Sequence, residues 1–179
     1  MNRSVAFAGA LALIGCASSG NTDTGGFVST SARGGFQNIS FQPSGRVFGE
    51  NFDYMTTESG YRGLLREELA SMESPDGERI TGTRGGSIID LHVQYEGATL
   101  RASGMFAGRL GRLQMDPAEL TTTFGSCSMQ LFRQRGLVYS GQRACSDGRI
   151  APAAVQLPSE ILRLPPHRRV MLLATLFYL

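Results

Sequence analysis

Residues 89–106, with the sequence IDLHVQYEGATLRASGMF, contain two segments in which apolar and polar side chains alternate. The alternation covers residues 89–95 and residues 100–106, and Glu96-Gly97 lies between them. A period of two residues is typical of a strand with one buried face, and a short connection containing Gly indicates a hairpin turn. The stretch therefore predicts an antiparallel hairpin with one face in the core and the other facing water or a partner.

A second hairpin is predicted on the C-terminal side of the first. Two segments, residues 124–133 and 137–145, flank the turn signal Gln134-Arg135-Gly136. A register that places Arg133 opposite Tyr139 also places Cys127 opposite Cys145. Opposite residues on antiparallel strands come within the distance that a disulfide requires.

The segment between residues 58 and 86 predicts a helix followed by a loop. Apolar side chains at positions 61, 64, 65, 69 and 72 follow a period of 3.6 residues, which indicates an amphipathic helix. Ser74-Pro75-Asp76-Gly77 is a stop signal. Residues 79–86 are rich in Gly and are expected to form a flexible connection that lacks the motifs of phosphate-binding loops.

The C-terminal segment predicts a short strand at residues 153–157, a short helix at residues 160–164 and a longer helix from Pro166 to the end. Residues 170–179 are almost entirely apolar, which indicates a buried core helix, because a membrane-spanning helix needs about 20 residues. Alternate positions from Met171 to Leu179 are also apolar, so a C-terminal strand remains an alternative.

These elements predict an α+β fold. The expected sheet is antiparallel, has about four to six strands built from hairpins, and carries two or more helices packed on one face. Four or five usable strands are too few to close even an eight-stranded barrel. A closed barrel is therefore not expected.

The first 15 residues have the pattern of a secretory signal peptide. Arg3 precedes an apolar run from Val5 to Ile14, and the small residue Gly15 follows it. This order of a basic start, an apolar run and a small residue is typical of exported proteins. The apolar run is shorter than the roughly 20 residues of a permanent membrane span.

Leu13-Ile14-Gly15-Cys16 resembles the lipobox of bacterial lipoproteins. The resemblance is confined to the signal segment, and it implies cleavage before Cys16 and acylation of its thiol and new amino group. Ala17 follows Cys16, and the absence of Asp at this position implies sorting to the outer membrane, on its periplasmic face or exposed at the surface. Two or three acyl chains provide firm anchoring.

The expected organisation follows from this resemblance and from composition. We assign residues 1–15 to the lipoprotein signal peptide, residues 16–35 to the lipidated cysteine and a flexible tether, and residues 36–179 to a single globular domain. Ser, Gly, Thr, Asn and Ala dominate the tether, and such a segment buries too little apolar area to offset the entropy of ordering.

Export also bears on the two remaining cysteines, because an oxidising compartment permits disulfides. We predict a disulfide between Cys127 and Cys145. Two buried thiols, or a metal or redox pair, are the alternatives, although no C-x-x-C motif supports a redox pair. Acylation of Cys16 accounts for the odd number of cysteines.

Composition excludes several classes of function. The chain has 179 residues and a formal charge of +2, which argues against nucleic-acid binding through bulk charge. All 17 of its Lys and Arg residues are Arg, so Schiff-base chemistry on Lys is excluded. Three Cys and two His are few for a zinc site, and neither a metal site nor a cofactor is predicted.

Asp90 and His92 are the candidate catalytic residues. They lie two apart on one predicted strand, so both face the polar side, where a carboxylate can orient an imidazole. Ser103 on the paired strand is a possible nucleophile, but no nucleophile elbow surrounds it. The alternative is an ordinary solvated strand face. A small basic cluster, Arg163, Arg168 and Arg169, is a candidate contact with anionic lipid.

Three functions remain open. The leading hypothesis is a non-enzymatic, periplasm-facing accessory or binding module of the outer membrane, whose partners are the membrane, through its lipid, and another envelope protein. The second is an envelope hydrolase that uses Asp90 and His92. The third is a carrier of a small apolar ligand, which requires a cavity between the sheet and the C-terminal helix.

Overall fold

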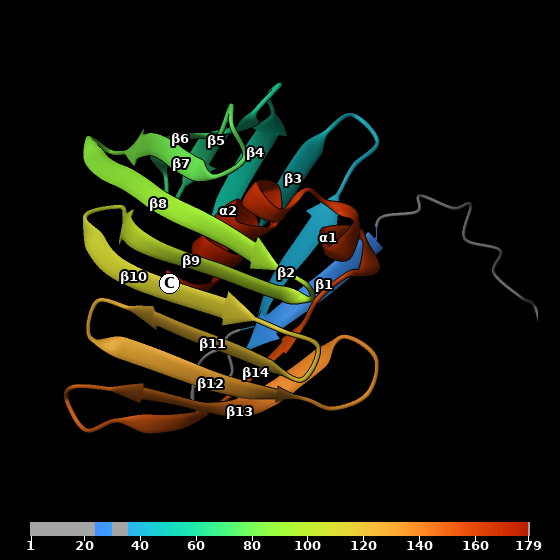
Figure 1. The fold of residues 1–179 in the computed structure, drawn as a ribbon, viewed down its shortest axis with the longest axis vertical. Coiled ribbons are helices and arrows are strands. Elements are labelled where there is room, and N and C mark those ends of the chain that lie inside the picture. The colour runs from blue at the N-terminus through green and yellow to red at the C-terminus, as the bar shows by residue number, and fades with distance from the viewer. Residues whose placement is uncertain (1–23, 30–35, 179) are drawn as a thin grey trace, which may run out of the picture.

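The computed structural model describes residues 24–29 and 36–178 of the chain, which form a barrel of antiparallel strands around a helix (Figure 1). Within these residues there are 14 strands and two helices. Each strand pairs with the next along the chain, and β1 pairs with β14, which closes the sheet. The expected α+β fold with four to six strands is therefore wrong, as is the expectation that no barrel closes.

The strands have the following bounds. The first seven are β1 (Thr24–Ser29), β2 (Phe36–Phe41), β3 (Arg46–Gly49), β4 (Phe52–Thr56), β5 (Gly60–Leu65), β6 (Glu68–Glu73) and β7 (Arg79–Arg84). The next seven are β8 (Ser87–Glu96), β9 (Thr99–Phe106), β10 (Arg109–Met115), β11 (Glu119–Phe124), β12 (Cys127–Arg133), β13 (Val138–Cys145) and β14 (Ile150–Gln156).

The first predicted hairpin is confirmed as β8 and β9. Val93 lies opposite Ala102, and both face the barrel interior, where they are buried. His92 and Gln94 alternate with the buried positions and are exposed on the outer face. Successive side chains of a strand point to opposite faces of the sheet, so this alternation assigns apolar side chains to the interior and polar ones to the outside.

The interior is occupied by the C-terminal helix α2 (Pro166–Phe177). In Figure 1 it lies inside the ring of strands, and it packs against β5, β7, β8 and β9. Residues 170–178 are buried around the whole circumference of the helix, as is typical of a helix enclosed by other elements. The prediction of a helix is confirmed, but its expected place on one face of a sheet is wrong.

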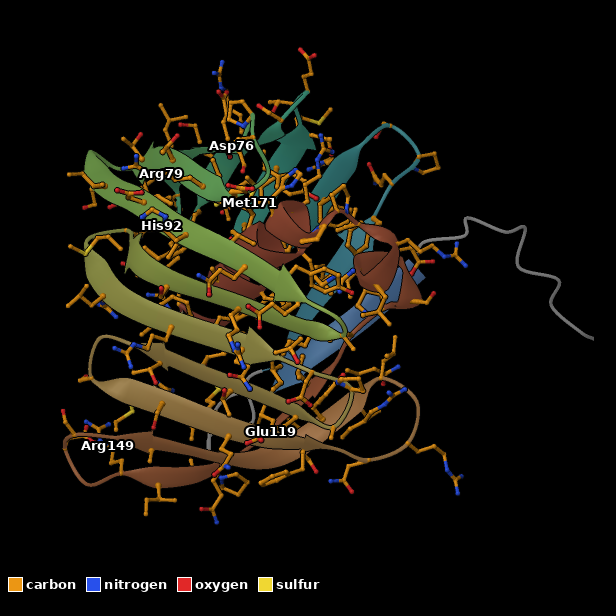
Figure 2. The ribbon with its side chains drawn as sticks, viewed as in Figure 1. Asp76, Arg79, His92, Glu119, Arg149 and Met171 are labelled. Carbon is orange, nitrogen blue, oxygen red and sulfur yellow. A yellow bond between two sulfur atoms is a disulfide. The ribbon has the colours of Figure 1, made fainter. Side chains whose placement is uncertain are left out.

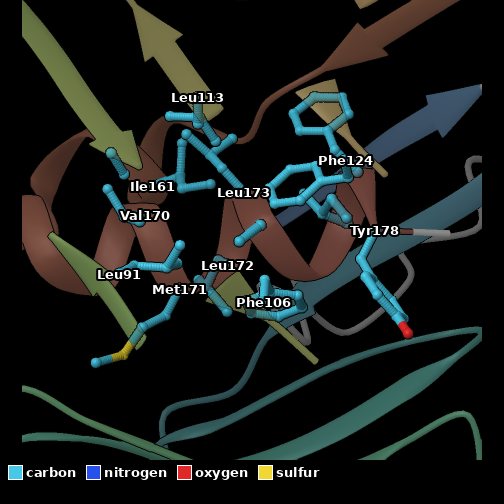
Figure 3. Packing of buried hydrophobic residues seen from close by; sticks show 14 of the residues in the cluster. Leu91, Phe106, Leu113, Phe124, Ile161, Val170, Met171, Leu172, Leu173 and Tyr178 are labelled. Carbon is cyan, nitrogen blue, oxygen red and sulfur yellow. The ribbon is translucent and has the colours of Figure 1, made fainter. Parts of the chain in front are cut away.

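Aromatic and aliphatic side chains of the barrel wall pack around α2. Figure 3 shows Leu173 and Tyr178 near Phe106, Leu113 and Phe124 from the surrounding strands. Each fully buried side chain of this size contributes about 1.5–3 kcal/mol through removal of apolar surface from water. The short helix α1 (Ser159–Arg163) precedes α2 and contributes Ile161 to the same core.

The helix predicted from positions 61–72 is instead the hairpin of β5 and β6. Arg66 and Glu67 both have positive φ angles, +50° and +66°, and they join Leu65 to its cross-strand partner Glu68. Positive φ angles at both central residues are what a two-residue hairpin turn of type I′ needs. Leu64 and Leu69, which completed the helical pattern, point outward and are 42% and 77% exposed.

Two segments expected to lack regular structure also form strands. Residues 79–84 are β7, where Gly82 lies opposite Ile89 of β8. Residues 24–29, which were assigned to the flexible tether, are β1 and pair with both β2 and β14. Hydrogen bonding to two neighbouring strands supplies the order that composition did not indicate.

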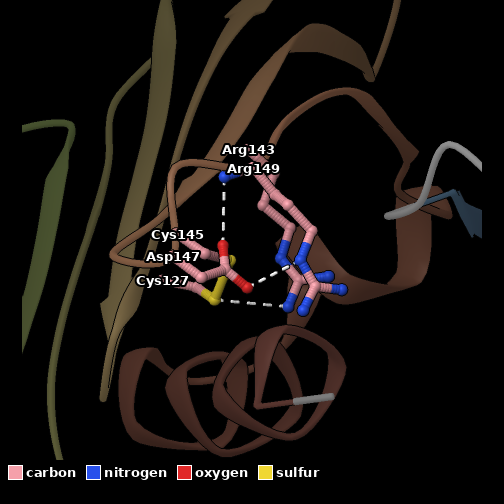
Figure 4. Close-up of a disulfide and its surroundings, with 5 residues drawn as sticks. All are labelled: Cys127, Arg143, Cys145, Asp147 and Arg149. Atoms are coloured by element: carbon pink, nitrogen blue, oxygen red, sulfur yellow. Dashed lines mark hydrogen bonds and ion pairs between the residues drawn. A yellow bond between two sulfur atoms is a disulfide. The ribbon is translucent and has the colours of Figure 1, made fainter.

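The second predicted hairpin and its disulfide are confirmed. Cys127 of β12 lies opposite Cys145 of β13, Arg133 lies opposite Tyr139, and the two cysteines are bonded. Figure 4 shows this disulfide beside Arg143, whose Nη2 lies 3.4 Å from Cys127 Sγ. The register alone was sufficient to bring the two sulfur atoms together.

The predicted signal peptide and Cys16 lie outside the described residues. Among the residues that are described, neither helix is long and apolar enough to cross a membrane.

Candidate functional site

The outer wall of the barrel carries a polar hollow over strands β8–β11. Its volume is about 420 Å³, and His92, Arg101, Ser103 and Arg112 are among the side chains that line it. In Figure 1 these strands run side by side across the front of the barrel, and Figure 2 shows His92 on β8 at one edge of this surface. The hollow therefore lies on the outer face of the barrel wall, whereas α2 packs against the inner face of the same wall.

Register explains why these side chains gather. Cross-strand pairs join outward-facing residues of neighbouring strands into rows that run across the barrel wall. One row, from β8 to β13, consists of His92, Ser103, Arg112, Thr123, Ser128 and Ala144. The adjacent row consists of Gln94, Arg101, Gln114, Thr121, Gln130 and Gln142. We call these twelve positions the polar face.

The polar face contains cations but no carboxylate. Arg101 donates from Nε to Gln114 Oε1 at 3.3 Å and from Nη1 to Glu96 Oε2 at 3.5 Å, at the edge of the hollow. Both contacts are long for charge-assisted hydrogen bonds. The guanidinium of Arg112 is exposed and makes no ion pair or hydrogen bond within the part of the chain that the structure describes. Both arginines therefore retain donors for a ligand.

Asp90 is committed to a different partner. Its two carboxylate oxygens accept hydrogen bonds from Arg79 Nε and Nη2, at 2.8 and 2.7 Å. These bonds to Arg79 lower the pKa of the Asp90 carboxyl below its ordinary value, and the nearby His92 adds a smaller effect in the same direction. Because Arg79 occupies both oxygens, Asp90 is poorly placed to orient the His92 imidazole.

His92 and Ser103 are brought together as the sequence predicted. They are direct cross-strand partners on β8 and β9, and both line the hollow. Across the described residues, however, no hydrogen bond joins the His92 ring to Ser103 or to Asp90. Transfer of a proton from the serine to the histidine would need such a contact, directly or through water.

The described residues also contain no group of three or more His, Cys, Asp and Glu side chains that could hold a metal ion. His92 faces Arg79 on one side and Ser103 on the other. A divalent cation needs ligands that donate electron pairs, and guanidinium groups cannot supply them.

Two arginines of the basic cluster near the start of α2, Arg168 and Arg169, have structural roles in the described chain, whereas Arg163 is exposed. Arg168 Nη2 donates to the carbonyl oxygens of Thr57 and Glu58, at 2.8 and 2.7 Å. Arg169 Nη2 donates to the carbonyl oxygens of Leu162 and Leu164. These bonds attach the helix start to the loop after β4 and to the segment after α1, so these guanidiniums hold the helix in the barrel.

Two polar side chains in the interior, Tyr54 of β4 and Thr175 of α2, contact each other. Tyr54 OH and Thr175 Oγ1 lie 3.3 Å apart, and Thr175 Oγ1 also donates to Met171 O at 2.9 Å. Burial raises the pKa of Tyr54 and of Tyr61 to about 12, so both phenols are neutral over the ordinary pH range. The helix takes the place where a bound apolar molecule would sit.

Sequence reasoning identified His92 and Ser103 but not the rest of the polar face. A signal was present, because Arg112 and Gln114 alternate with Leu113 and Met115, and residues 119–124 continue a strand pattern. No strand is predicted at residues 109–115, because Gly108 and Gly111 interrupt the apolar pattern where β10 lies. The rows emerge only when the registers of all six strands are known.

Comparison with known proteins adds no assignment to this geometry. No family model, curated protein or solved structure matches the chain.

Proposed function

We propose that this chain is a non-enzymatic, lipid-anchored binding module of a bacterial outer membrane that faces the periplasm. The observation that carries the proposal is the hollow in the polar face, which presents two arginines and several amide and hydroxyl groups on a closed wall. Such a surface has donors for a ligand, while the interior behind it is filled by the protein's own helix.

Rigidity supports a binding role. The strands that carry the hollow are bonded to neighbours on both sides, and the apolar side of the wall packs on α2. Ordering a flexible surface on binding costs free energy, and a backbone held in a closed barrel avoids part of that cost. The barrel thus fixes the backbone positions from which Arg101 and Arg112 extend.

Anchoring rests on the lipobox-like segment that ends at Cys16. Replacement by Cys16→Ser is expected to release the protein from the membrane fraction or to leave its signal segment uncleaved. Fractionation of cells expressing each form measures this. Unchanged fractionation with the outer membrane would refute the lipid anchor.

The binding role is tested by photo-crosslinking in intact cells. A photoreactive residue at Thr123, within the hollow, should capture a discrete partner from the envelope. The matched control carries the same residue at Thr83, an exposed position on the outer face of β7. Capture at both positions alike, or at neither, would contradict a binding role for the polar face.

A hydrolase is the second candidate, because His92 lies directly opposite Ser103 and both line the hollow. If this candidate is correct, His92→Ala and Ser103→Ala should each reproduce the phenotype of a deletion strain, whereas Ser128→Ala in the same row should not. Wild-type behaviour of the His92→Ala strain would remove the candidate. We do not propose the carrier of an apolar ligand, because residues 170–177 of α2 already occupy the interior.

A further inference from the structure

We infer that the polar face binds an acidic glycan, a chain of hydroxyl-bearing sugar units with carboxylate groups, laid across strands β8–β13. This inference deepens the proposed binding role and rests on it. It specifies the class of ligand and its direction on the barrel wall.

The direction follows from the shape of the face. The two rows cross six consecutive strands, and neighbouring strands are about 4.8 Å apart, so the rows extend for about 24 Å. Each strand contributes one outward side chain to each row. A ligand that contacts the side chains along the full length of both rows is long and narrow, and it lies perpendicular to the strands.

The uncharged residues indicate the chemistry of the ligand. Gln114, Gln130 and Gln142 recur on β10, β12 and β13, and serines and threonines lie beside them. An amide side chain both donates and accepts hydrogen bonds, as does a hydroxyl. Sugar hydroxyls have the same dual capacity, so successive units of a glycan can be satisfied along the row.

The charges indicate that the glycan is acidic. Arg101 and Arg112 lie on β9 and β10, and none of the twelve positions is Asp or Glu. Of the carboxylates that border the face, Asp90 binds Arg79, Glu96 lies 3.5 Å from Arg101, and Glu119 accepts a bond of 2.8 Å from Gln130. A guanidinium forms paired hydrogen bonds with a planar carboxylate.

Other macromolecules fit less well. A nucleic acid has a phosphate at every unit and is normally held by several cations and by stacking on aromatic rings, which the polar face lacks. A peptide cannot add as a strand, because the sheet is closed and has no free edge. The rows contain no large apolar side chain that would insert into lipid.

The test uses the full lipidated chain, purified in detergent, and measures binding by titration calorimetry. The probe is a linear hexamer of galacturonic acid. A hexamer of β-linked glucose supplies hydroxyls without charge, and hexaglutamate supplies charge without hydroxyls. We expect the galacturonate hexamer to bind more tightly than either control, and its affinity to decrease as salt is added.

Variants locate the site. Arg112→Ala is expected to weaken binding of the galacturonate hexamer about tenfold, because it removes a charge-assisted contact. Gln130→Ala with Gln142→Ala should weaken it by a smaller factor. Arg62→Ala, an exposed arginine on the outer face of β5, is the matched control and should bind like the wild type. Thermal unfolding of each variant verifies that it is folded.

Absence of binding by the galacturonate hexamer, equal binding of hexaglutamate, or an unchanged affinity in Arg112→Ala would overturn the inference. These results are distinguishable from failure of the binding role itself. If the Thr123 crosslink captures a protein while the glycan does not bind, the binding role stands and the glycan inference fails. If neither is observed, both fail.

Discussion

Arg84 of β7 and Tyr178, the residue that follows α2, join the barrel wall to the helix inside it. Arg84 Nη1 donates a hydrogen bond of 2.9 Å to Tyr178 OH, and its guanidinium carbon lies 5.1 Å from the centre of the Tyr178 ring. Arg109 of β10 contacts the same ring at 5.0 Å, and Tyr178 OH donates to Ala107 O at 3.4 Å. One side chain thus attaches the helix end to two strands and a turn.

Tyr178→Phe should therefore destabilise the protein. The variant keeps the ring and its cation contacts but loses the hydroxyl, which leaves the Arg84 donor and the Ala107 carbonyl without this partner. The expected loss is about 1–2 kcal/mol in the free energy of unfolding, measured by urea denaturation. Tyr95→Phe, at a half-exposed position on β8, is the control and should lie within about 0.5 kcal/mol of the wild type.

Thr175→Val tests the polar contact between α2 and β4. The substitution removes the hydroxyl 3.3 Å from Tyr54 OH and leaves that buried phenol without it, at an expected cost of about 1–3 kcal/mol. Addition of Tyr54→Phe to this variant should recover part of the loss, because both polar partners are then gone. A double-mutant cycle measures the coupling. Strictly additive effects would show that the two hydroxyls are not coupled.

Loss of the Cys127–Cys145 disulfide should destabilise the folded chain. The two residues are 18 positions apart, and the chain-entropy account gives about 3 kcal/mol for a loop of this length. Urea denaturation of the Cys127→Ala, Cys145→Ala double variant measures the loss. Thiol labelling of the denatured, unreduced wild type should modify neither cysteine, and labelling of both would contradict the bond.

Glu67→Gly distinguishes the β5–β6 hairpin from the helix that the sequence suggested. Glu67 has a φ of +66°, a left-handed conformation that costs a residue with a side chain about 1 kcal/mol more than glycine. The variant should therefore be slightly more stable than the wild type in thermal unfolding. In a helix the same substitution would destabilise by about 1 kcal/mol, so a decrease in stability would contradict the hairpin.

Alkaline pH should unfold the barrel through its buried tyrosines. Burial raises the pKa of Tyr54 and Tyr61 from 10.0 to about 12, so the folded state favours the neutral phenols. Their contribution to stability is complete below about pH 10, the unfolded value, and is lost as pH rises from about 10 to about 12. Unfolding free energies measured across this range should decline less steeply in Tyr54→Phe. An identical slope would show that Tyr54 ionises equally in both states.

Local pattern was enough where a strand alternates cleanly and its partner is near in sequence. Residues 89–106 have both properties, and the register of residues 127–145 could be deduced from the turn alone, which led to the disulfide. The same reasoning failed at residues 61–72, because two short strands with a tight turn place apolar residues at spacings that also suit a helix. It also gave no strand at residues 109–115, where Gly108 and Gly111 interrupt the apolar pattern.

The sequence by itself determined the two hairpins, and it favoured the cysteine pair and a buried C-terminal helix over their alternatives, because each depends on periodicity or on contacts between neighbours in the chain. It also placed His92 and Ser103 on one outer face. Closure of the barrel, the place of α2 inside it and the polar face were decided only by the tertiary structure. The barrel closes only because β1 pairs with β14. The polar face forms only because the registers of six strands align their outward side chains in rows. Such contacts between distant segments are stabilised by the apolar surface that the whole core buries together. A short segment of the sequence carries no information about that total.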